Sequence, residues 1–338
     1  MKTCTGLSLV IGICLVVIAT TSPSRKLKKL IIDTDAGGDD AAAILLALGF
    51  EKHSEMSNFE VVAITCTYGN TNLTNVATNV LKILTIANRS DIPVYAGAQK
   101  SMMKKFTKGN YFGEDGFGDF HFDEEIVARL NRSSHASLAM VDLARDHPGE
   151  VSVMAIGPLT NLALAMTLDS SFVKNVERFY LLGSSVRGWG NVAPNVEFNF
   201  SQDPQSNFIV LNGTDEKTAF LFPWEANLDA KIPMKWRRDV LGSMGSKTMK
   251  YLNKIERPTL NGPVWHVGDL ALAALVVYPE LISSTLVTNV TPVFDGSAEG
   301  SVLVDYANTT NKPQNVEILL SFDVPKFQNF LLDIFSRD

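Results

Sequence analysis

Leu27–Asp40 reads LKKLIIDTDAGGDD, and this stretch decides the fold. Its apolar, β-branched half predicts a strand over Leu27–Asp33, which a Gly-Gly turn separates from an apolar, helix-like stretch over Asp40–Leu48. A strand, a turn and a helix in that order form the repeating unit of a parallel sheet. This stretch therefore predicts an α/β protein.

The same order of elements recurs along the chain. Each predicted strand is followed by a turn rich in Gly, Asn or Asp and then by a helix-like stretch, and the uninterrupted apolar strands are typical of a sheet covered on both faces. We therefore expect an α/β fold with a single doubly wound domain, a mostly parallel central sheet and a functional site at the carboxyl ends of the strands. The further units are Phe59–Thr67 with Asn75–Ala87, Val151–Ile156 with Thr160–Met166, and Phe179–Leu182 with a helix that Asp203 and Pro204 open, Asp203 being its N-cap.

The composition limits the kinds of partner that the protein can have. The 338 residues are 46% hydrophobic and 20% charged, which excludes a disordered chain, a collagen and a small disulfide-bonded scaffold. A net charge of −6 is a poor match for nucleic acid or an anionic membrane, because both bind basic surfaces. The expected partner is therefore a small molecule and not a nucleic acid.

The first 22 residues are expected to be a cleaved secretory signal peptide rather than part of the fold. Lys2 gives a short positive region, Leu7–Ala19 is an uninterrupted apolar run, and small residues follow it. Cleavage somewhere in residues 19–24 would leave a domain of residues 25–338, with Cys66 as its one cysteine and no second apolar run long enough to span a bilayer. The mature protein would then be secreted, extracellular and free of the membrane. The alternative is a signal anchor that stays attached.

Asn-X-Ser/Thr sequons agree with export, because they are acceptors for N-linked glycans in secreted proteins. They predict a glycoprotein, and the alternative is that several of them are buried and unmodified. The sequons begin at Asn72, Asn88, Asn131, Asn199, Asn212, Asn289 and Asn308.

The turn after the first predicted strand is strongly acidic. Asp33, Asp35, Asp39 and Asp40 lie within eight residues, and carboxylates at this density repel one another unless a cation or a basic side chain neutralises them. The Gly-Gly pair within the turn is expected to let the backbone bend sharply. Oxygen ligands with no His or Cys nearby favour Ca²⁺ or Mg²⁺ over Zn²⁺. The alternative is a solvated acidic loop in which Asp39 or Asp40 caps the next helix.

Polar residues also follow the other predicted strands. Asn70 follows the second strand, and Thr160 follows the third in a Gly-Pro-Leu-Thr-Asn turn that is by itself an ordinary connection between strand and helix. Asn191, Glu197 and Asn199 follow the fourth strand. A carboxylate and two amides close together can bind the hydroxyls of a polyol such as a sugar, and ordinary loop polarity is the alternative.

Together these segments resemble the nucleoside hydrolase family, the Ca²⁺-dependent type that prefers inosine and uridine. The most specific match is the pattern Asp-x-Asp-x-Gly-x-Asp-Asp, which is present over Asp33–Asp40. The resemblance extends from about Leu30 to the C-terminal helix. It implies an enzyme that hydrolyses the N-glycosidic bond of ribonucleosides to free base and ribose, with a nucleoside as its small-molecule partner and Ca²⁺ as its cofactor.

The resemblance also implies a role for individual residues. Asp35 would be the general base that deprotonates a calcium-bound water, and an Asn199 that binds sugar would be inaccessible to glycosylation. Relatives often assemble as dimers or tetramers, so the resemblance is compatible with a homo-oligomer, although no surface argument selects one. The implied metal ligands are Asp35, Asp40, Asp269 and the backbone carbonyl of Thr160; the implied substrate contacts are Asp39, Asn191, Glu197 and Asn199 to the ribose hydroxyls and Asn70 close to base and sugar.

The leaving-group machinery of the family is where this sequence departs most. Phe112 and Gly268 stand where relatives often carry His or Trp. His266 is then the nearest ionisable candidate for the acid that assists the departing base. It can reach the pocket if residues 265–268 are extended, because it then points to the same side as Gly268, but not if they are helical. Stacking of Phe112 or Trp265 on the base is a separate hypothesis.

Two other functions compete with this interpretation. The changes at Phe112 and Gly268 are compatible with a catalytically impaired, secreted nucleoside- or calcium-binding protein. The Asp33-Thr34-Asp35 segment also fits the nucleophile motif of haloacid-dehalogenase-type phosphatases, but Gly37 stands where those enzymes need Thr or Val. The preferred base and the physiological role are not determined by the sequence.

Overall fold

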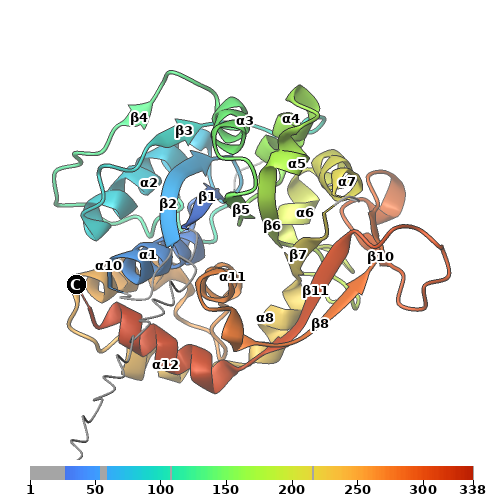
Figure 1. Cartoon of the computed structure of the whole chain (residues 1–338). Coiled ribbons are helices and arrows are strands. Elements are labelled where there is room, and N and C mark those ends of the chain that lie inside the picture. Colours follow the sequence, from blue (N-terminus) through green and yellow to red (C-terminus); the bar gives the residue numbers. More distant parts are fainter. Residues whose placement is uncertain (1–26, 54–58, 107–108, 215–216, 338) are drawn as a thin grey trace, which may run out of the picture.

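A mostly parallel, nine-stranded sheet runs through the centre of the protein (Figure 1). The computed structural model describes residues 27–53, 59–106, 109–214 and 217–337. The expected signal peptide and its cleavage site lie outside these residues, so both stay predictions. The strands follow the order β4-β3-β2-β1-β5-β6-β7-β11-β8, and only the edge strand β8 runs antiparallel to its neighbour.

The strands of this sheet are mostly short. A separate antiparallel pair, β9 (Val290–Pro292) and β10 (Val302–Val304), lies beyond its edge. The strands of the large sheet are β1 (Lys28–Thr34), β2 (Phe59–Cys66), β3 (Val94–Ala96), β4 (Leu130–Asn131), β5 (Val151–Ala155), β6 (Val176–Leu182), β7 (Ala219–Phe222), β8 (Ile282–Thr288) and β11 (Val316–Phe322).

Helices cover both faces of the sheet. The α-helices are α1 (Gly38–His53), α2 (Leu73–Ala87), α3 (Ala136–Asp146), α4 (Thr160–Leu168), α5 (Phe172–Asn175), α6 (Phe198–Gln202), α7 (Pro204–Gly213), α8 (Trp224–Ala230), α9 (Met234–Trp236), α10 (Lys247–Ile255), α11 (Gly268–Val277) and α12 (Val324–Phe335). A π-helical turn, η1 (Arg237–Leu241), and three 3₁₀ turns, η2 (Arg257–Thr259), η3 (Pro279–Leu281) and η4 (Gly296–Ala298), complete the set.

The central strand β1 shows why the sheet is covered on both sides. Leu30 and Ile32 belong to one buried apolar cluster, whereas Ile31 between them belongs to a second cluster on the opposite face. Helices α1, α10, α11 and α12 pack together on the first face, and α3, α4 and α7 lie on the second (Figure 1). The expected doubly wound α/β domain is therefore confirmed.

The strand order determines where a ligand can bind. The chain builds the sheet outward from β1 in one direction through β2 and β3, and in the other through β5, β6 and β7. In open α/β sheets, the crevice at the carboxyl ends of the strands where the direction reverses is the usual site. The acidic turn after β1 and the Gly157-Pro158 turn after β5 flank this crevice.

The predicted elements are present, with shifted ends. Asp203 is the N-cap of α7, as expected, and accepts a hydrogen bond from the backbone N–H of Ser206. Helix α1 runs further than predicted, to His53, because its last turns pack between the sheet and α12. The sequence interpretation did not identify β7 as a strand.

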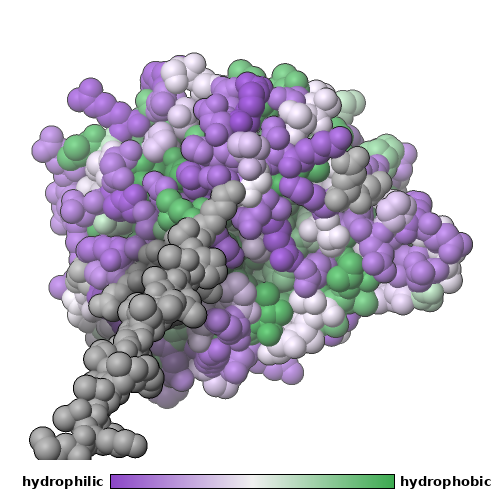
Figure 2. All heavy atoms as spheres, in the orientation of Figure 1, coloured by the Kyte–Doolittle hydropathy of each residue, from purple (hydrophilic) through white to green (hydrophobic). Residues whose placement is uncertain are grey.

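The face of the molecule seen in Figure 2 is mostly hydrophilic, with hydrophobic side chains in small separate patches. None of the helices in the described part of the chain is both long and apolar enough to cross a membrane.

Candidate active site

Three aspartates converge where the first turns of two helices meet. Asp39 and Asp40 lie in the first turn of α1, and Asp269 lies in the first turn of α11, which packs directly on α1. One carboxylate oxygen from each of the three lies within 4.8 Å of the others. Negative charge is favourable at helix N-termini, so the two helix dipoles offset part of the repulsion.

Asp35 lies beneath this cluster and is almost completely buried. Its Oδ2 accepts a hydrogen bond of 2.6 Å from the backbone N–H of Asn70, while its Oδ1 is buried and has no hydrogen-bond partner within the described ranges. A Cβ at residue 69 would lie 2.0 Å from Oδ2, so only glycine allows the chain after β2 to approach this close. Burial, together with the charge of Asp40, raises the pKa of Asp35 well above its usual range.

Asp33 is separated from the other three aspartates of the turn. Its side chain is buried in the sheet, where Oδ1 accepts hydrogen bonds from Thr65 (2.7 Å) and Asn161 (2.8 Å). Burial raises the pKa of Asp33 to about 7. Asp33 thus ties β1 to β2 and to α4, and the convergent cluster consists of Asp35, Asp39, Asp40 and Asp269.

This convergent cluster has no internal counter-charge. Within the described ranges, no Lys or Arg forms an ion pair with any of its four members. Burial raises the pKa of Asp40 to about 7, with a further contribution from Asp39, and burial with the charges of Asp39 and Asp40 raises that of Asp269. Oxygen donors alone, one of them the unpartnered Oδ1 of Asp35, fit a hard divalent cation.

The acidic turn bends at a different residue from the one that the sequence suggested. Ala36, and neither glycine of the pair, has a left-handed backbone, with φ of 41°. The glycines are needed because they have no side chain: a Cβ at Gly37 would lie 2.5 Å from Nδ2 of Asn70, and one at Gly38 would lie 2.8 Å from the ring of Phe112. Neighbouring side chains therefore occupy the space above the turn.

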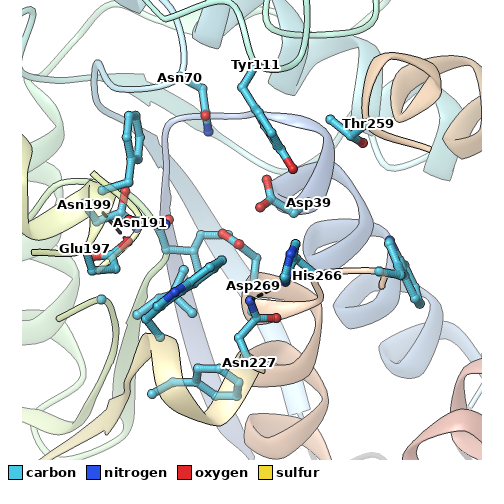
Figure 3. A pocket seen from close by; sticks show the side chains of 18 of the residues that line it. Asp39, Asn70, Tyr111, Asn191, Glu197, Asn199, Asn227, Thr259, His266 and Asp269 are labelled. Carbon is cyan, nitrogen blue, oxygen red and sulfur yellow. Dashed lines mark hydrogen bonds between the residues drawn. The ribbon is translucent and has the colours of Figure 1, made fainter. Parts of the chain in front are cut away.

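A cavity of about 420 Å³ opens above the cluster (Figure 3). Asp39, Asp269 and Asn70 line it from the side of β1 and α11, and three of the predicted polyol ligands line the opposite side. Asp35, Asp40 and Thr160 are not among its lining residues and lie below its floor. The three polyol ligands are Asn191, Glu197 and Asn199.

Glu197 and Asn199 are held rigidly at this wall. Glu197 is the N-cap of α6, and its carboxylate accepts hydrogen bonds from the backbone N–H groups of Ser184, Asn199 and Phe200. Burial raises the pKa of Glu197 to about 7. Asn199 donates its amide to the carbonyl of Ile156, which fixes it against the end of β5. Asn191, by contrast, is exposed at the rim of the cavity.

Thr160, predicted as a ligand through its backbone carbonyl, starts α4 and is buried. Its hydroxyl donates a 2.7 Å hydrogen bond to Asp203. The part of the backbone carbonyl in metal binding stays a prediction.

Aromatic rings form the upper wall of the cavity. Phe112 is buried over the acidic turn, and Tyr111 packs edge-on against it with ring centroids 4.8 Å apart. Figure 3 shows the hydroxyl of Tyr111 directed toward Asp39. Phe112 therefore lies at the cavity, as the stacking hypothesis requires.

His266 lines the cavity, although residues 265–268 are not extended throughout, because Val267 has φ of −128° and ψ of 19°. Residues 265–267 are not helical, α11 begins only at Gly268, and both His266 and Gly268 line the cavity. The imidazole lies against the indole of Trp224, with ring centroids 5.1 Å apart, and burial lowers its pKa.

Trp265 points the other way, into the protein. Its indole N–H donates a 3.0 Å hydrogen bond to Glu256, and the same carboxylate binds the fully buried Arg237. Arg237 also lies over the Trp265 ring, 5.4 Å from its centroid. These contacts fix the Trp265 ring inside the protein, so that it lines the cavity only in part.

Sequence reasoning missed several residues that line the cavity, among them Trp224, Asn227, Tyr111 and Glu256. Trp224 and Asn227 follow β7, so the rule that pointed to residues after the other strands would have found them had that strand been recognised. Tyr111 and Glu256 come from long connections far from any predicted strand end, and no sequence signal identified them.

Comparisons with known proteins agree with this geometry. The family model described as inosine-uridine preferring nucleoside hydrolase matches residues 30–329. A probable uridine nucleosidase 2 of Arabidopsis thaliana is 31% identical over 324 residues, which cover 90% of this chain and 97% of that protein. An inosine-uridine preferring nucleoside hydrolase of Crithidia fasciculata is 28% identical over 92% of this chain and 98% of its own. The solved structure of an inosine-guanosine nucleoside hydrolase superposes with a TM-score of 0.84 at 26% identity, covering 92% of this chain and 99% of that one.

The unbalanced charge of the cluster leads to a prediction about stability. In a chelating buffer, Asp269→Asn should raise the melting temperature by a few degrees, because it removes about 2 kcal/mol of repulsion among buried carboxylates. The same variant should lose most of the stabilisation that a divalent cation gives to the wild-type protein. Thermal scans with and without cation check both effects, and Asp295→Asn, at an exposed aspartate, is the matched control. A lower melting temperature of Asp269→Asn in chelator would contradict the charge argument.

Proposed function

The chain belongs to the inosine-uridine preferring nucleoside hydrolase family. On that premise we propose that its aspartate cluster binds Ca²⁺ and that Asp35 is the general base of the reaction. The protein is a hydrolase of the N-glycosidic bond of ribonucleosides, which it cleaves to free base and ribose. The observation that carries the proposal is the convergence of Asp39, Asp40 and Asp269 at a cavity of about 420 Å³, without a basic partner among the described residues. The buried carboxylate of Asp35 lies beneath these three.

The proposed ligands are Asp35, Asp40 and Asp269, together with the backbone carbonyl of Thr160. Ca²⁺ suits them because it accepts a variable number of oxygen ligands in flexible geometry, including carboxylates that bind through both oxygens. When bound, the cation would neutralise the cluster and lower the pKa of a coordinated water. These are the two contributions that the protein itself lacks.

Asp35 is the best placed proton acceptor. Its Oδ1 has no hydrogen-bond partner among the described residues, so its lone pairs are free for the proton of a water molecule that attacks the anomeric carbon. Its raised pKa favours acceptance of that proton. The hydrogen bond from the Asn70 backbone holds Oδ2 and leaves Oδ1 as the reacting atom.

The ribose would lie between the two polar walls. Departure of the base leaves positive charge on the sugar ring, and the carboxylates of Asp39 and Glu197 lie at the cavity to stabilise it. Asp39, Asn191, Glu197 and Asn199 would bind the hydroxyls, and Asn70 would lie close to both sugar and base. Glu197 and Asn199 are preorganised for this role by the backbone bonds that fix them.

The base would then face the aromatic side of the cavity, which Phe112, Trp224 and His266 line. Assistance to the leaving group falls to His266 because it is the histidine at this wall. Nothing in the comparisons favours a phosphatase or an impaired binding protein.

The proposal includes secretion through the predicted signal peptide. Support comes from the positions of the sequons, since Asn88, Asn212 and Asn308 are exposed and accessible to glycosylation. Asn199 and Asn289 are buried, with exposed fractions of 4% and 7%, so we do not expect glycans there.

The metal and the base are tested together by kinetics. Release of base from inosine and uridine should require Ca²⁺ and stop in excess chelator. With Ca²⁺ present, Asp35→Asn should lower kcat by about 10²–10⁴-fold, because it removes the proton acceptor but keeps the hydrogen bond from Asn70. Asp269→Ala should also lose most of the rate, and Asp295→Asn should lose none. Full turnover in chelator would exclude the metal assignment. A near-normal kcat of Asp35→Asn would exclude Asp35 as the general base.

The role of His266 is tested by its substrate dependence. His266→Ala should slow hydrolysis of inosine by about tenfold or more, since the departing base loses a hydrogen bond. It should affect p-nitrophenyl riboside little, because that leaving group is already a stable anion. Equal losses on the two substrates, or no loss, would reject assistance to the leaving group.

Secretion is tested by expressing the full chain in a eukaryotic host. The protein should reach the medium, and endoglycosidase should lower its apparent mass. Combined Asn88→Gln, Asn212→Gln and Asn308→Gln changes should remove most of that shift, whereas Asn289→Gln, at a buried sequon, should not alter it. Retention of an unglycosylated protein inside the cells would count against export.

A further inference from the structure

The side-chain amide of Asn227 in α8 joins the start of α11 to His266. Its Oδ1 accepts a 2.7 Å hydrogen bond from the backbone N–H of Val267. A backbone N–H can only donate, so the oxygen of this amide must face Val267. The orientation of the amide is therefore fixed by chemistry, and the NH₂ group is the part that faces His266.

The same reasoning determines which ring nitrogen of His266 carries the proton. Nδ2 of Asn227 lies 3.1 Å from Nδ1 of His266, and an amide NH₂ group can only donate. Nδ1 must then carry the lone pair, and in a neutral imidazole the proton is on Nε2. Figure 3 shows Asn227 directly beside the imidazole, with this hydrogen bond drawn between them.

We propose that Asn227 is a positioning residue that holds His266 as the neutral Nε2–H tautomer, so that the imidazole presents a fixed hydrogen-bond donor to the nucleobase. The proposal rests on the function proposed above, because it assigns the base to this side of the cavity. It changes the expected role of His266 from an acid that ionises to a neutral donor.

Three further observations support a fixed donor. The imidazole lies on Trp224 at an interplanar angle of 37°, which limits rotation of the ring. Among the residues that the structure describes, none is hydrogen-bonded to Nε2, and His266 lines the cavity, so Nε2 is available to a ligand. Burial lowers the pKa of His266, which favours the neutral ring.

A neutral donor has a specific chemical consequence. As the N-glycosidic bond breaks, its electron pair moves onto the base, and negative charge grows on ring nitrogens and carbonyl oxygens that can accept a hydrogen bond. Hydrogen bonds to charged groups are stronger than those to neutral groups, so the donor stabilises the departing base more than the bound substrate. The structure thus points to selectivity for leaving groups with an acceptor atom at this wall.

The first test determines the tautomer of His266 directly and does not depend on enzymatic activity. The protein, with ¹⁵N-labelled histidine, gives long-range ¹H–¹⁵N spectra that distinguish a protonated ring nitrogen from one with a lone pair. The chain has five histidines, and the signal lost in His266→Ala assigns the ring. We expect Nε2 protonated and Nδ1 unprotonated at neutral pH. A proton on Nδ1 in the neutral ring, or a fully protonated ring, overturns the proposal.

The second test inverts the hydrogen bond. Asn227→Asp keeps an acceptor for the N–H of Val267 but replaces the NH₂ group by an oxygen, so the neutral ring should carry its proton on Nδ1. At alkaline pH, where the imidazole is neutral, this variant should lose about tenfold in kcat/KM on inosine and little on p-nitrophenyl riboside. Asn131→Asp is the matched control, because the side chain of Asn131 also accepts a backbone N–H, that of Ser133, and does not line the cavity.

The outcomes separate this inference from the proposed function. An unchanged tautomer in Asn227→Asp, or equal losses on the two substrates, overturns the role of Asn227 while hydrolysis by the wild-type protein stands. Absence of hydrolysis of either substrate by the wild-type protein refutes the proposed function, and the spectra still report whether Asn227 sets the tautomer.

Discussion

Repulsion among buried carboxylates is the constraint on which the site depends. Asp39, Asp40 and Asp269 converge at the cavity, with Asp35 beneath them, and none of the four has a basic partner in the described part of the chain. Burial raises the pKa of each. A hydrophobic core alone would not tolerate this arrangement, because unpaired buried charge is costly. The helix N-termini offset part of the cost, and a cation would offset the rest.

The surrounding scaffold serves to hold these carboxylates in place. Glycine at residue 69 lets the chain after β2 pack onto Asp35, and the side chains of Asn70 and Phe112 fill the space that Gly37 and Gly38 leave open. The packing of α11 on α1 brings Asp269 to a turn that lies far from it in the sequence. Close packing of this kind leaves little freedom for the aspartates to move apart.

The cavity divides into two chemically different halves. Carboxylates and amides line the half near β1, β5 and α6, where the proposed function places the ribose. Aromatic rings and the imidazole of His266 line the half where it places the base. His266 lies in this second half, and its hydrogen bond to Asn227 fixes the orientation of the imidazole.

Local patterns in the sequence were enough to predict the α/β class, the acidic turn and the residues that follow β1, β2, β5 and β6. Strand periodicity and turn composition are local properties, and parallel strands necessarily bring their carboxyl ends to one edge of the sheet. Tertiary structure alone decided three other features of the site. These are the left-handed backbone at Ala36, the separation of Asp33 from the cluster, and the positions at the cavity of Trp224, Asn227, Tyr111 and Glu256. Each depends on contacts between segments distant along the chain: Asp33 bonds to Thr65 and Asn161, and Asn227 meets His266 only because α8 and α11 pack together. Such contacts leave no periodic signal in a single sequence, so only the folded chain determines them.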